Sequence, residues 1–367
     1  REDPEWLARC RAEFVLQHTG ATENLALWRM FVRHSIAELE RVYERLGVAY
    51  DTVRGESHYR DKLAGVVETL ESQGLTRISE GATVVDLDDE SLPLCIVRKS
   101  DGGFNYATTD LATVAERVRE YDPERIVYVT DERQQLHFKQ VFAVCRKLGY
   151  RVRFDHVWFG LMRLPEGTFS TREGNVIPLE QLLDKAEEMA LDVVRTSSPD
   201  LPPGQQRDIA RAVGIGAVKY IDLCQNPQSL VTFTWEKALT LEGNSGPYLQ
   251  YAYARIASVR RKYKDRFPEG EPERFPLRLD EPMERALAVK LTQFPDVVRH
   301  AARTYKPSVI ADFLYELAQT YSSFYQNVPF LTAEEGVRES RVRLCSITAS
   351  VLKTGLGLLG LETPQRI

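Results

Sequence analysis

The chain has few cysteines, no long apolar run and no excess of basic residues. Its five cysteines, Cys10, Cys95, Cys145, Cys224 and Cys345, lie far apart and form no Cys-x-x-Cys pair, which argues against disulfides and structural zinc. No apolar run approaches the roughly 20 residues that span a bilayer, and the opening residues lack the signature of a signal peptide. We therefore expect a cytoplasmic protein without membrane contacts.

Length and charge constrain the remaining possibilities. A chain of 367 residues with 43% hydrophobic content predicts about two domains, each with its own core. The net charge is −5, so a nucleic-acid surface has to be a local patch rather than a property of the whole chain.

Hydrophobic periodicity separates an α/β part from an all-helical part. Helical spacing runs from Glu2 to about Leu46 and again up to Gly74, and residues 82–108 look like a β-hairpin that turns at Asp101-Gly102. Residues 108–162 then alternate between helix and buried strand, which predicts half of a doubly wound parallel sheet covered on both faces. From about Lys237 onward only helical patterns remain.

Three stretches at predicted strand ends could carry chemistry, because ligands bind at the carboxyl ends of such strands. The loop GTFSTREGN, residues 167–175, is either an ordinary turn or an anion clamp built from hydroxyls and Arg172. Tyr106 and Asp110 share one helical face, where Asp110 is either a first-turn acid or the partner of a guanidinium. Gln134 and His137 begin the next predicted helix.

Two further stretches suit flat ligands. In HVWFGLM, Gly160 permits close approach of a ring between Phe159 and Met162, although a plain core strand has the same pattern. The helix after Ser245-Gly246-Pro247 carries a stripe of aromatic and basic residues, Tyr248, Tyr251, Arg255, Ser258 and Lys262. Such a stripe is either a solvated face or a surface that stacks on unpaired bases.

Taken in order, these segments resemble arginyl-tRNA synthetases of class I. The resemblance runs along nearly the whole chain through GESHY, DGGFNYATTDLA, RIVYVTDERQQLH, HVWFGLM, FSTREGNVIPLEQLLDKA, AVGIGAVKY, EGNSGPYLQYAYARI and LGLLGLETPQRI. It implies a class I catalytic domain over residues 1–236, with a helical insertion at 1–81, the second half of a Rossmann-type nucleotide fold at 82–180 and connecting helices at 181–236. An all-helical anticodon-binding domain of the DALR type would then occupy residues 237–367.

The resemblance also implies roles for individual residues. Tyr106, Asp110 and Gln134 would hold the substrate L-arginine. Thr168 to Arg172 stand where the family has its K-M-S-K-S-type loop, and neither lysine of that motif is present. The expected ATP contacts are His137, Phe159, Gly160, Met162, Phe169, Ser170, Thr171 and Arg172, of which Ser170, Thr171 and Arg172 would be catalytic. Mg²⁺ would be bound through ATP, without a metal site on the protein.

The implied partner is the cognate arginine tRNA. Tyr248, Tyr251 and Arg255 match anticodon-facing positions, and Lys262 lies on the same stripe. Tyr321 and Phe324 look like neighbours of that surface, so all six residues are expected tRNA contacts. The expected protein is a monomer that forms an arginyl-adenylate from ATP and transfers the arginyl group to tRNA.

One departure opens an alternative. The family's H-I-G-H motif is not found, since His18-Thr19-Gly20-Ala21 lacks the final histidine. We therefore expect the C-terminal portion of a longer enzyme, and the alternative is a noncatalytic tRNA-binding or regulatory paralogue. Another class I synthetase, such as that for cysteine, would be expected to have zinc-ligand cysteines.

Overall fold

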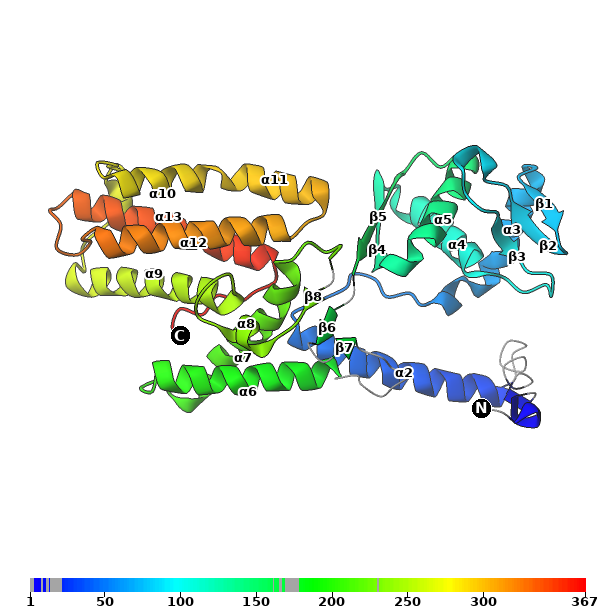
Figure 1. Cartoon of the computed structure of the whole chain (residues 1–367), viewed down its shortest axis with the longest axis horizontal. Coiled ribbons are helices and arrows are strands. Elements are labelled where there is room, and N and C mark those ends of the chain that lie inside the picture. Colours follow the sequence, from blue (N-terminus) through cyan, green and yellow to red (C-terminus); the bar gives the residue numbers. More distant parts are fainter. Residues whose placement is uncertain are drawn as a thin grey trace.

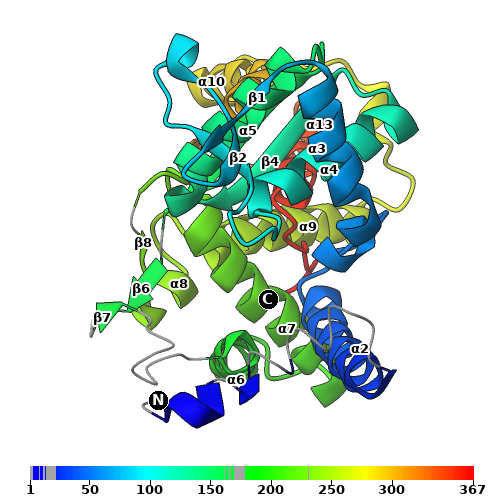
Figure 2. The ribbon, with the colours of Figure 1, turned by 90° about the vertical axis from the view of Figure 1, so that its right-hand side faces the viewer.

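The computed structural model describes residues 3–7, 9, 10, 13, 22–160, 162–164, 167, 168, 178–229 and 231–367. A β-sheet unit and a helical bundle form two lobes, and α2, α6 and α7 run beneath them (Figures 1 and 2). None of the helices in these ranges is long and apolar enough to cross a membrane.

The first described helices end where the sequence predicts. Helix α2, Thr22–Arg45, buries none of its residues, and Gly47 stops it with a left-handed φ of 63°. The backbone N–H of Val48 donates to Tyr43 O at 2.8 Å, which closes the helix end. A short 3₁₀ helix, η1 (Glu56–Lys62), leads into α3 (Leu63–Ser72), which ends before Gly74.

The hairpin region forms a small antiparallel sheet of its own, in the order β1 (Thr76–Ser79), β2 (Ala82–Val85) and β3 (Cys95–Arg98). The turn at Asp101-Gly102 is confirmed, since Lys99 N donates to Gly103 O at 2.8 Å. Strand β1 was not predicted, because it is joined to β2 by Glu80-Gly81 and not by the Asn-Gly pair that marks a hairpin turn in a sequence. Both turn residues nevertheless have positive φ, 49° and 79°, as a two-residue hairpin requires.

The parallel sheet is smaller than predicted. Among the described residues it consists of β4 (Arg125–Asp131) and β5 (Arg153–Phe159), paired in parallel from Arg125↔Arg153 to Asp131↔Phe159. The segment FNYAT adds no strand to it, because Phe104 makes a single bridge to Arg98 and the helix starts at Tyr106.

One face of this sheet carries the core of the lobe. Helices α4 (Tyr106–Tyr121) and α5 (Gln135–Lys147) lie on that face, where Ile126 and Tyr128 are buried with Phe138 and Val141. On the other face Val129 is 64% exposed. The prediction that both faces are covered is therefore not met within the described residues.

The connecting helices pack closely through glycine. Helices α6 (Leu179–Ser197) and α7 (Pro203–Leu223) lie against each other, and a Cβ at Gly214 would sit 2.6 Å from Ala186 O. A Cβ at Gly216 would likewise meet the Gln250 side chain at 2.9 Å. The two glycines of AVGIGAVKY thus bring α6 and α9 against α7. A second small sheet has the order β7 (Gly167–Thr168), β6 (Met162–Leu164) and β8 (Val231–Thr232), and the short helix α8 (Trp235–Leu239) packs against α7.

The helical bundle completes the chain with α9 (Gly246–Arg266), α10 (Pro282–Thr292), α11 (Phe294–Thr304), α12 (Ser308–Asn327) and α13 (Val337–Leu358). The sequence allows either Ser245 or Gly246 as the cap of α9, and in the structure Ser245 is the cap, accepting from Tyr248 N. Fully buried Leu249, Ile256, Leu314 and Leu352 form the centre of the bundle core.

A polar contact ties the bundle to the sheet. Tyr305, in a left-handed conformation after α11, donates its hydroxyl proton to Asp155 Oδ2 at 2.7 Å. The same hydroxyl accepts from Arg125 Nη1 at 2.9 Å. Because Arg125 begins β4 and Asp155 lies early in β5, the bundle holds the amino ends of both strands.

Candidate functional site

The polar groups at the carboxyl end of β4 include a close carboxylate–imidazole pair. Asp110 lies in the second turn of α4 and His137 in the first turn of α5, and His137 Nε2 is 2.6 Å from Asp110 Oδ2. Both side chains are about one quarter exposed, so the pair is open to a ligand on one side only. The positive end of the α5 dipole favours a carboxylate at this place.

Local sequence explains why α4 and α5 start at these positions. Asn105 accepts from Tyr106 N at 2.9 Å and begins α4, while the buried Thr108 hydroxyl donates to Val97 O and fixes α4 against β3. Asp131 ends β4 and accepts from Arg133 N at 2.8 Å, which turns the chain toward α5. The Arg133 guanidinium holds the pKa of Asp131 below its usual range.

The other two residues predicted to hold arginine are exposed. Tyr106 is 68% exposed at the start of α4, and Gln134 is exposed at the N-cap position of α5. No hydrogen bond joins either side chain to another group in the described ranges. Asp110 therefore contacts α5, the helix that begins after Gln134. The side chains of Tyr106 and Gln134 remain able to bind a ligand.

A second histidine lies behind the pair and was not predicted as a site residue. His156 of β5 shares a hydrogen bond with the Thr130 hydroxyl at 2.8 Å, and its ring lies 4.9 Å from that of Phe138. Burial lowers the pKa of His156, and the neighbouring His137 lowers it further. The position of His156 next to Thr130 and Phe138 depends on the register between β4 and β5, so the sequence alone does not indicate it.

The structure places two of the predicted adenine residues in different surroundings. Phe159 ends β5 and is 43% exposed, whereas Met162 packs against the core of α6 and α7. The Gly160 N–H already donates to Pro227 O at 2.8 Å, so a ring could approach this residue only through its Cα. Phe169, Ser170, Thr171 and Arg172 lie outside the described residues.

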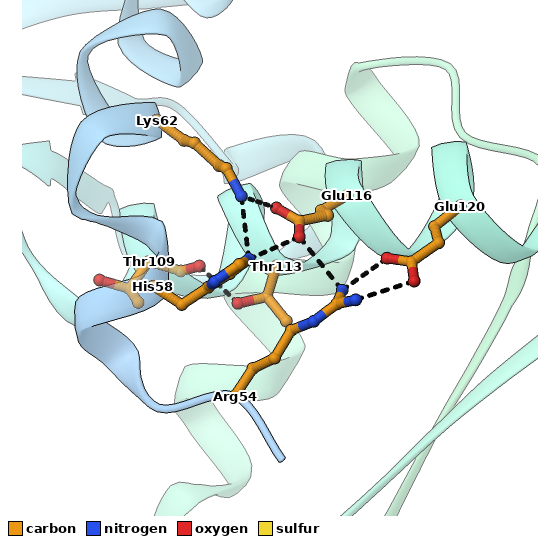
Figure 3. Close-up of polar contacts among 7 residues, drawn as sticks. All are labelled: Arg54, His58, Lys62, Thr109, Thr113, Glu116 and Glu120. Carbon is orange, nitrogen blue, oxygen red and sulfur yellow. Dashed lines mark hydrogen bonds and ion pairs between the residues drawn. The ribbon is translucent and has the colours of Figure 1, made fainter. Parts of the chain in front are cut away.

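An ionic cluster anchors the helix that carries Asp110 (Figure 3). The Glu116 carboxylate is 7% exposed and contacts three basic groups, with Arg54 Nη1 at 3.1 Å, His58 Nε2 at 2.7 Å, and the Lys62 ammonium. Hydrogen bonds from Lys62 and His58 lower the pKa of Glu116 to about 2. The cluster thus fastens residues 54–62 to α4.

A second surface lies on α9, in the helical bundle. The Arg255 guanidinium is 4.8 Å from the Tyr251 ring centroid and 5.3 Å from that of Tyr325, so it sits between two aromatic rings. These residues line a cavity of about 440 Å³ together with Ser258, Arg261, Arg366 and the loop 197–201. Arginine among aromatic rings is suited to stacking on a base and pairing with phosphate.

The basic residues of α9 lack acidic partners. Within the described ranges no ion pair involves Arg255, Arg260, Arg261, Lys262, Lys264 or Arg266. Arg261 instead donates to Gln365 O at 3.0 Å, and burial together with nearby Arg366 lowers its pKa. A group of basic residues that form no ion pair within the described ranges, in an acidic chain, favours a polyanionic ligand.

Four of the predicted RNA contacts fall elsewhere. Tyr321 and Phe324 are 0% exposed in the bundle core, so they cannot stack on a base, and their prediction as contacts is wrong. Tyr248 packs edge-on against Tyr315, and Lys262 is exposed beyond the cavity. The sequence did not point to Tyr325 or Arg366 as residues of this cavity. Continuing the buried stripe of α12 from Leu314 and Leu317 to positions 321 and 324 would have left Tyr325 at its edge.

Comparisons with known proteins agree with this architecture. Residues 1–235 match the family described as tRNA synthetases class I (R), catalytic domain, and residues 249–367 match the DALR anticodon binding domain. The arginine–tRNA ligase of Fusobacterium nucleatum is 44% identical over 361 residues, which are 98% of this chain and 63% of that protein. The chain thus spans less than two thirds of the length of this relative.

Two solved structures are similar over nearly the whole chain. The arginyl-tRNA synthetase of Plasmodium falciparum superposes with a TM-score of 0.85 at 25% identity, covering 97% of this chain and 61% of that one. The arginyl-tRNA synthetase of Thermus thermophilus gives a TM-score of 0.82 at 25% identity, covering 100% of this chain and 68% of that one. The catalytic-domain family model matches well over half of the residues of this chain, so the chain belongs to the class I arginyl-tRNA synthetase family.

Proposed function

We propose that the protein, as a monomer, ligates arginine to its cognate tRNA through an arginyl-adenylate. The observation that carries this proposal is the Asp110 carboxylate, held by His137 at the carboxyl end of the parallel strands. A partly buried carboxylate matches a planar guanidinium, which can form two parallel hydrogen bonds to it. Lysine has no such planar fork, so the same residue would select against it.

The two remaining residues complete the arginine site in this proposal. Tyr106 shares the exposed face of α4 with Asp110, one turn earlier, and its ring covers the aliphatic part of the substrate. Gln134, at the start of α5, offers an amide to the polar groups of the substrate. Both side chains are free to turn toward a ligand, since neither is hydrogen-bonded within the described part of the chain.

The reaction has two steps. An arginine carboxylate oxygen attacks the α-phosphorus of ATP in line, and the bond to pyrophosphate breaks. A terminal ribose hydroxyl of the tRNA then attacks the arginyl carbonyl carbon, and AMP leaves with the bonding electrons. The protein contributes mainly orientation and charge stabilisation to these steps.

The ATP side of the site rests on residues near the end of β5. Phe159, Gly160 and Met162 would face adenine, and Ser170, Thr171 and Arg172 would contact the phosphates. We assign Mg²⁺ to the phosphates of ATP rather than to protein ligands, because Mg²⁺ in such sites is bound largely through substrate phosphates.

The tRNA side rests on the α9 surface. Arg255 between Tyr251 and Tyr325 would stack on an unpaired anticodon base, and the unpaired cations farther along α9 would contact phosphates. A second function, tRNA binding without charging, rests on this surface alone, because Tyr251, Arg255 and Tyr325 line one cavity.

One experiment separates the two functions. Purified protein is incubated with ATP, Mg²⁺, labelled arginine and arginine tRNA, and charging and filter retention of the tRNA are measured in the same tube. Charging that requires ATP supports the ligase. Retention without charging supports the tRNA-binding function, and absence of both would refute the two proposals.

A further inference from the structure

The contact between Asp110 and His137 differs from an ion pair on the open surface because it joins two helices, α4 and α5, and is partly buried. The two side chains are 27% and 26% exposed. In the described residues Asp110 Oδ1 has no hydrogen-bond partner, so His137 is the only side chain that holds this carboxylate. Oδ1 and one lone pair of Oδ2 therefore remain open to a ligand.

The imidazole of His137 is itself fixed in place. Its ring packs edge-on against buried Phe138 with centroids 5.1 Å apart. Phe138 in turn packs against Tyr128 and His156. The orientation of the His137 ring is thus set by the aromatic core of the sheet unit rather than by solvent.

Recognition of a guanidinium depends on the plane of the carboxylate. The terminal torsion of an aspartate is broad, so an unrestrained carboxylate samples many planes and presents the two-oxygen edge only part of the time. A hydrogen bond to one oxygen from a fixed ring restricts that torsion before the ligand arrives. Such preorganisation increases affinity without any new contact to the ligand.

We propose that His137 is a positioning residue for arginine recognition, whose Nε2–H holds the Asp110 carboxylate in the plane that receives the guanidinium. This inference rests on the proposed function of Asp110 and replaces the expected role of His137 as an ATP contact. In this role His137 acts through Asp110, whose Oδ2 lies 2.6 Å from His137 Nε2.

A matched pair of variants tests the hydrogen bond. His137→Phe keeps a ring that can pack on Phe138 but removes the donor, whereas His137→Gln restores an N–H at a similar reach. L-arginine, ATP and arginine tRNA are titrated separately into each protein by calorimetry or filter binding. We expect His137→Phe to weaken arginine binding by about tenfold and His137→Gln by less than about threefold, as for a hydrogen bond to a charged group. Affinities for ATP and tRNA should stay unchanged.

Several results would overturn the inference. Unchanged arginine affinity in His137→Phe would show that the pair is only structural, and weaker ATP binding with normal arginine binding would return His137 to the ATP site. Equal losses in the Phe and Gln variants would exclude the hydrogen bond as the cause. If His137→Phe does not fold, His137→Gln is compared with His137→Ala in the same titrations.

Asp110→Asn separates this inference from the proposed function. If wild-type protein binds arginine, Asp110→Asn abolishes that binding and His137→Phe has no effect, only the role of His137 fails. If wild-type protein does not bind arginine, the arginine site and the role of His137 fail together. In the double variant, His137→Phe should add little to Asp110→Asn, because it acts through that carboxylate.

Discussion

The two candidate sites differ in how their charges are balanced. In the sheet unit Asp110 is paired with His137, and Glu116 is surrounded by Arg54, His58 and Lys62. On α9 the basic side chains form no ion pair within the described residues. Internal pairing fixes geometry for a small ligand, whereas uncompensated charge attracts a large polyanion and makes its binding sensitive to salt. The comparison predicts that substitutions in the two regions affect different ligands.

The largest effect should come from removing the charge that is proposed to bind arginine. Asp110→Asn keeps the size of the side chain but loses the charge, so arginine affinity should fall by about a hundredfold, in the range for a truncated charge pair. Filter retention of tRNA should not change. Equal losses of arginine and tRNA binding would contradict the expectation that the two regions bind different ligands.

The next effect concerns stability in the sheet unit. Glu116→Gln leaves Arg54, His58 and Lys62 close together without a carboxylate, so the Tm should fall by several degrees at neutral pH. Glu38→Gln is the matched control, since Glu38 pairs with Arg41 on the exposed surface of α2. A Tm as high as that of the control variant would mean that the cluster is not structural.

The pH dependence of that effect has a defined sign. The folded-state pKa of Glu116 is lowered to about 2, from about 4.3 in an unfolded chain. Its stabilisation is therefore complete above the unfolded value and is lost as pH falls toward the folded value. The Tm difference between wild type and Glu116→Gln should shrink from about pH 5 to about pH 3. A constant difference would contradict this assignment.

A smaller effect is expected on α9. Arg255→Ala removes the guanidinium between Tyr251 and Tyr325, so tRNA affinity should fall by about tenfold and its salt slope by about one unit. Arginine affinity should stay the same. Arg299→Ala is the control, because that exposed arginine on α11 is paired with Asp296. An unaltered salt slope in Arg255→Ala would indicate a solvated surface without RNA.

The smallest effect should arise where the two lobes meet. Tyr305→Phe removes the hydroxyl that links Asp155 and Arg125 and should cost about 1 kcal/mol of stability. Binding of arginine and of tRNA, measured as above, should be unchanged by this substitution. A large loss of either one would mean that the contact supports a site directly.

Sequence patterns were sufficient where a feature is local. Helical spacing placed Tyr106 and Asp110 on one face of α4, away from its buried stripe, and limited the cap of α9 to Ser245 or Gly246. They were insufficient where a feature depends on packing between elements. The approach of His137 to Asp110 depends on how α4 lies against α5, and no local spacing encodes it. Tyr321 was misplaced because aromatic residues near a functional stripe suit a core equally well.

The contact at Tyr305 joins the bundle to one end of the strand pair. The bundle grips β4 and β5 where they begin, and Asp131 and Phe159 end the same strands at the opposite edge, beside the candidate arginine site. Seven residues of extended chain separate the two ends, roughly 20 Å. The bundle therefore restrains both strands at their amino ends, at the opposite end from Asp110 and His137.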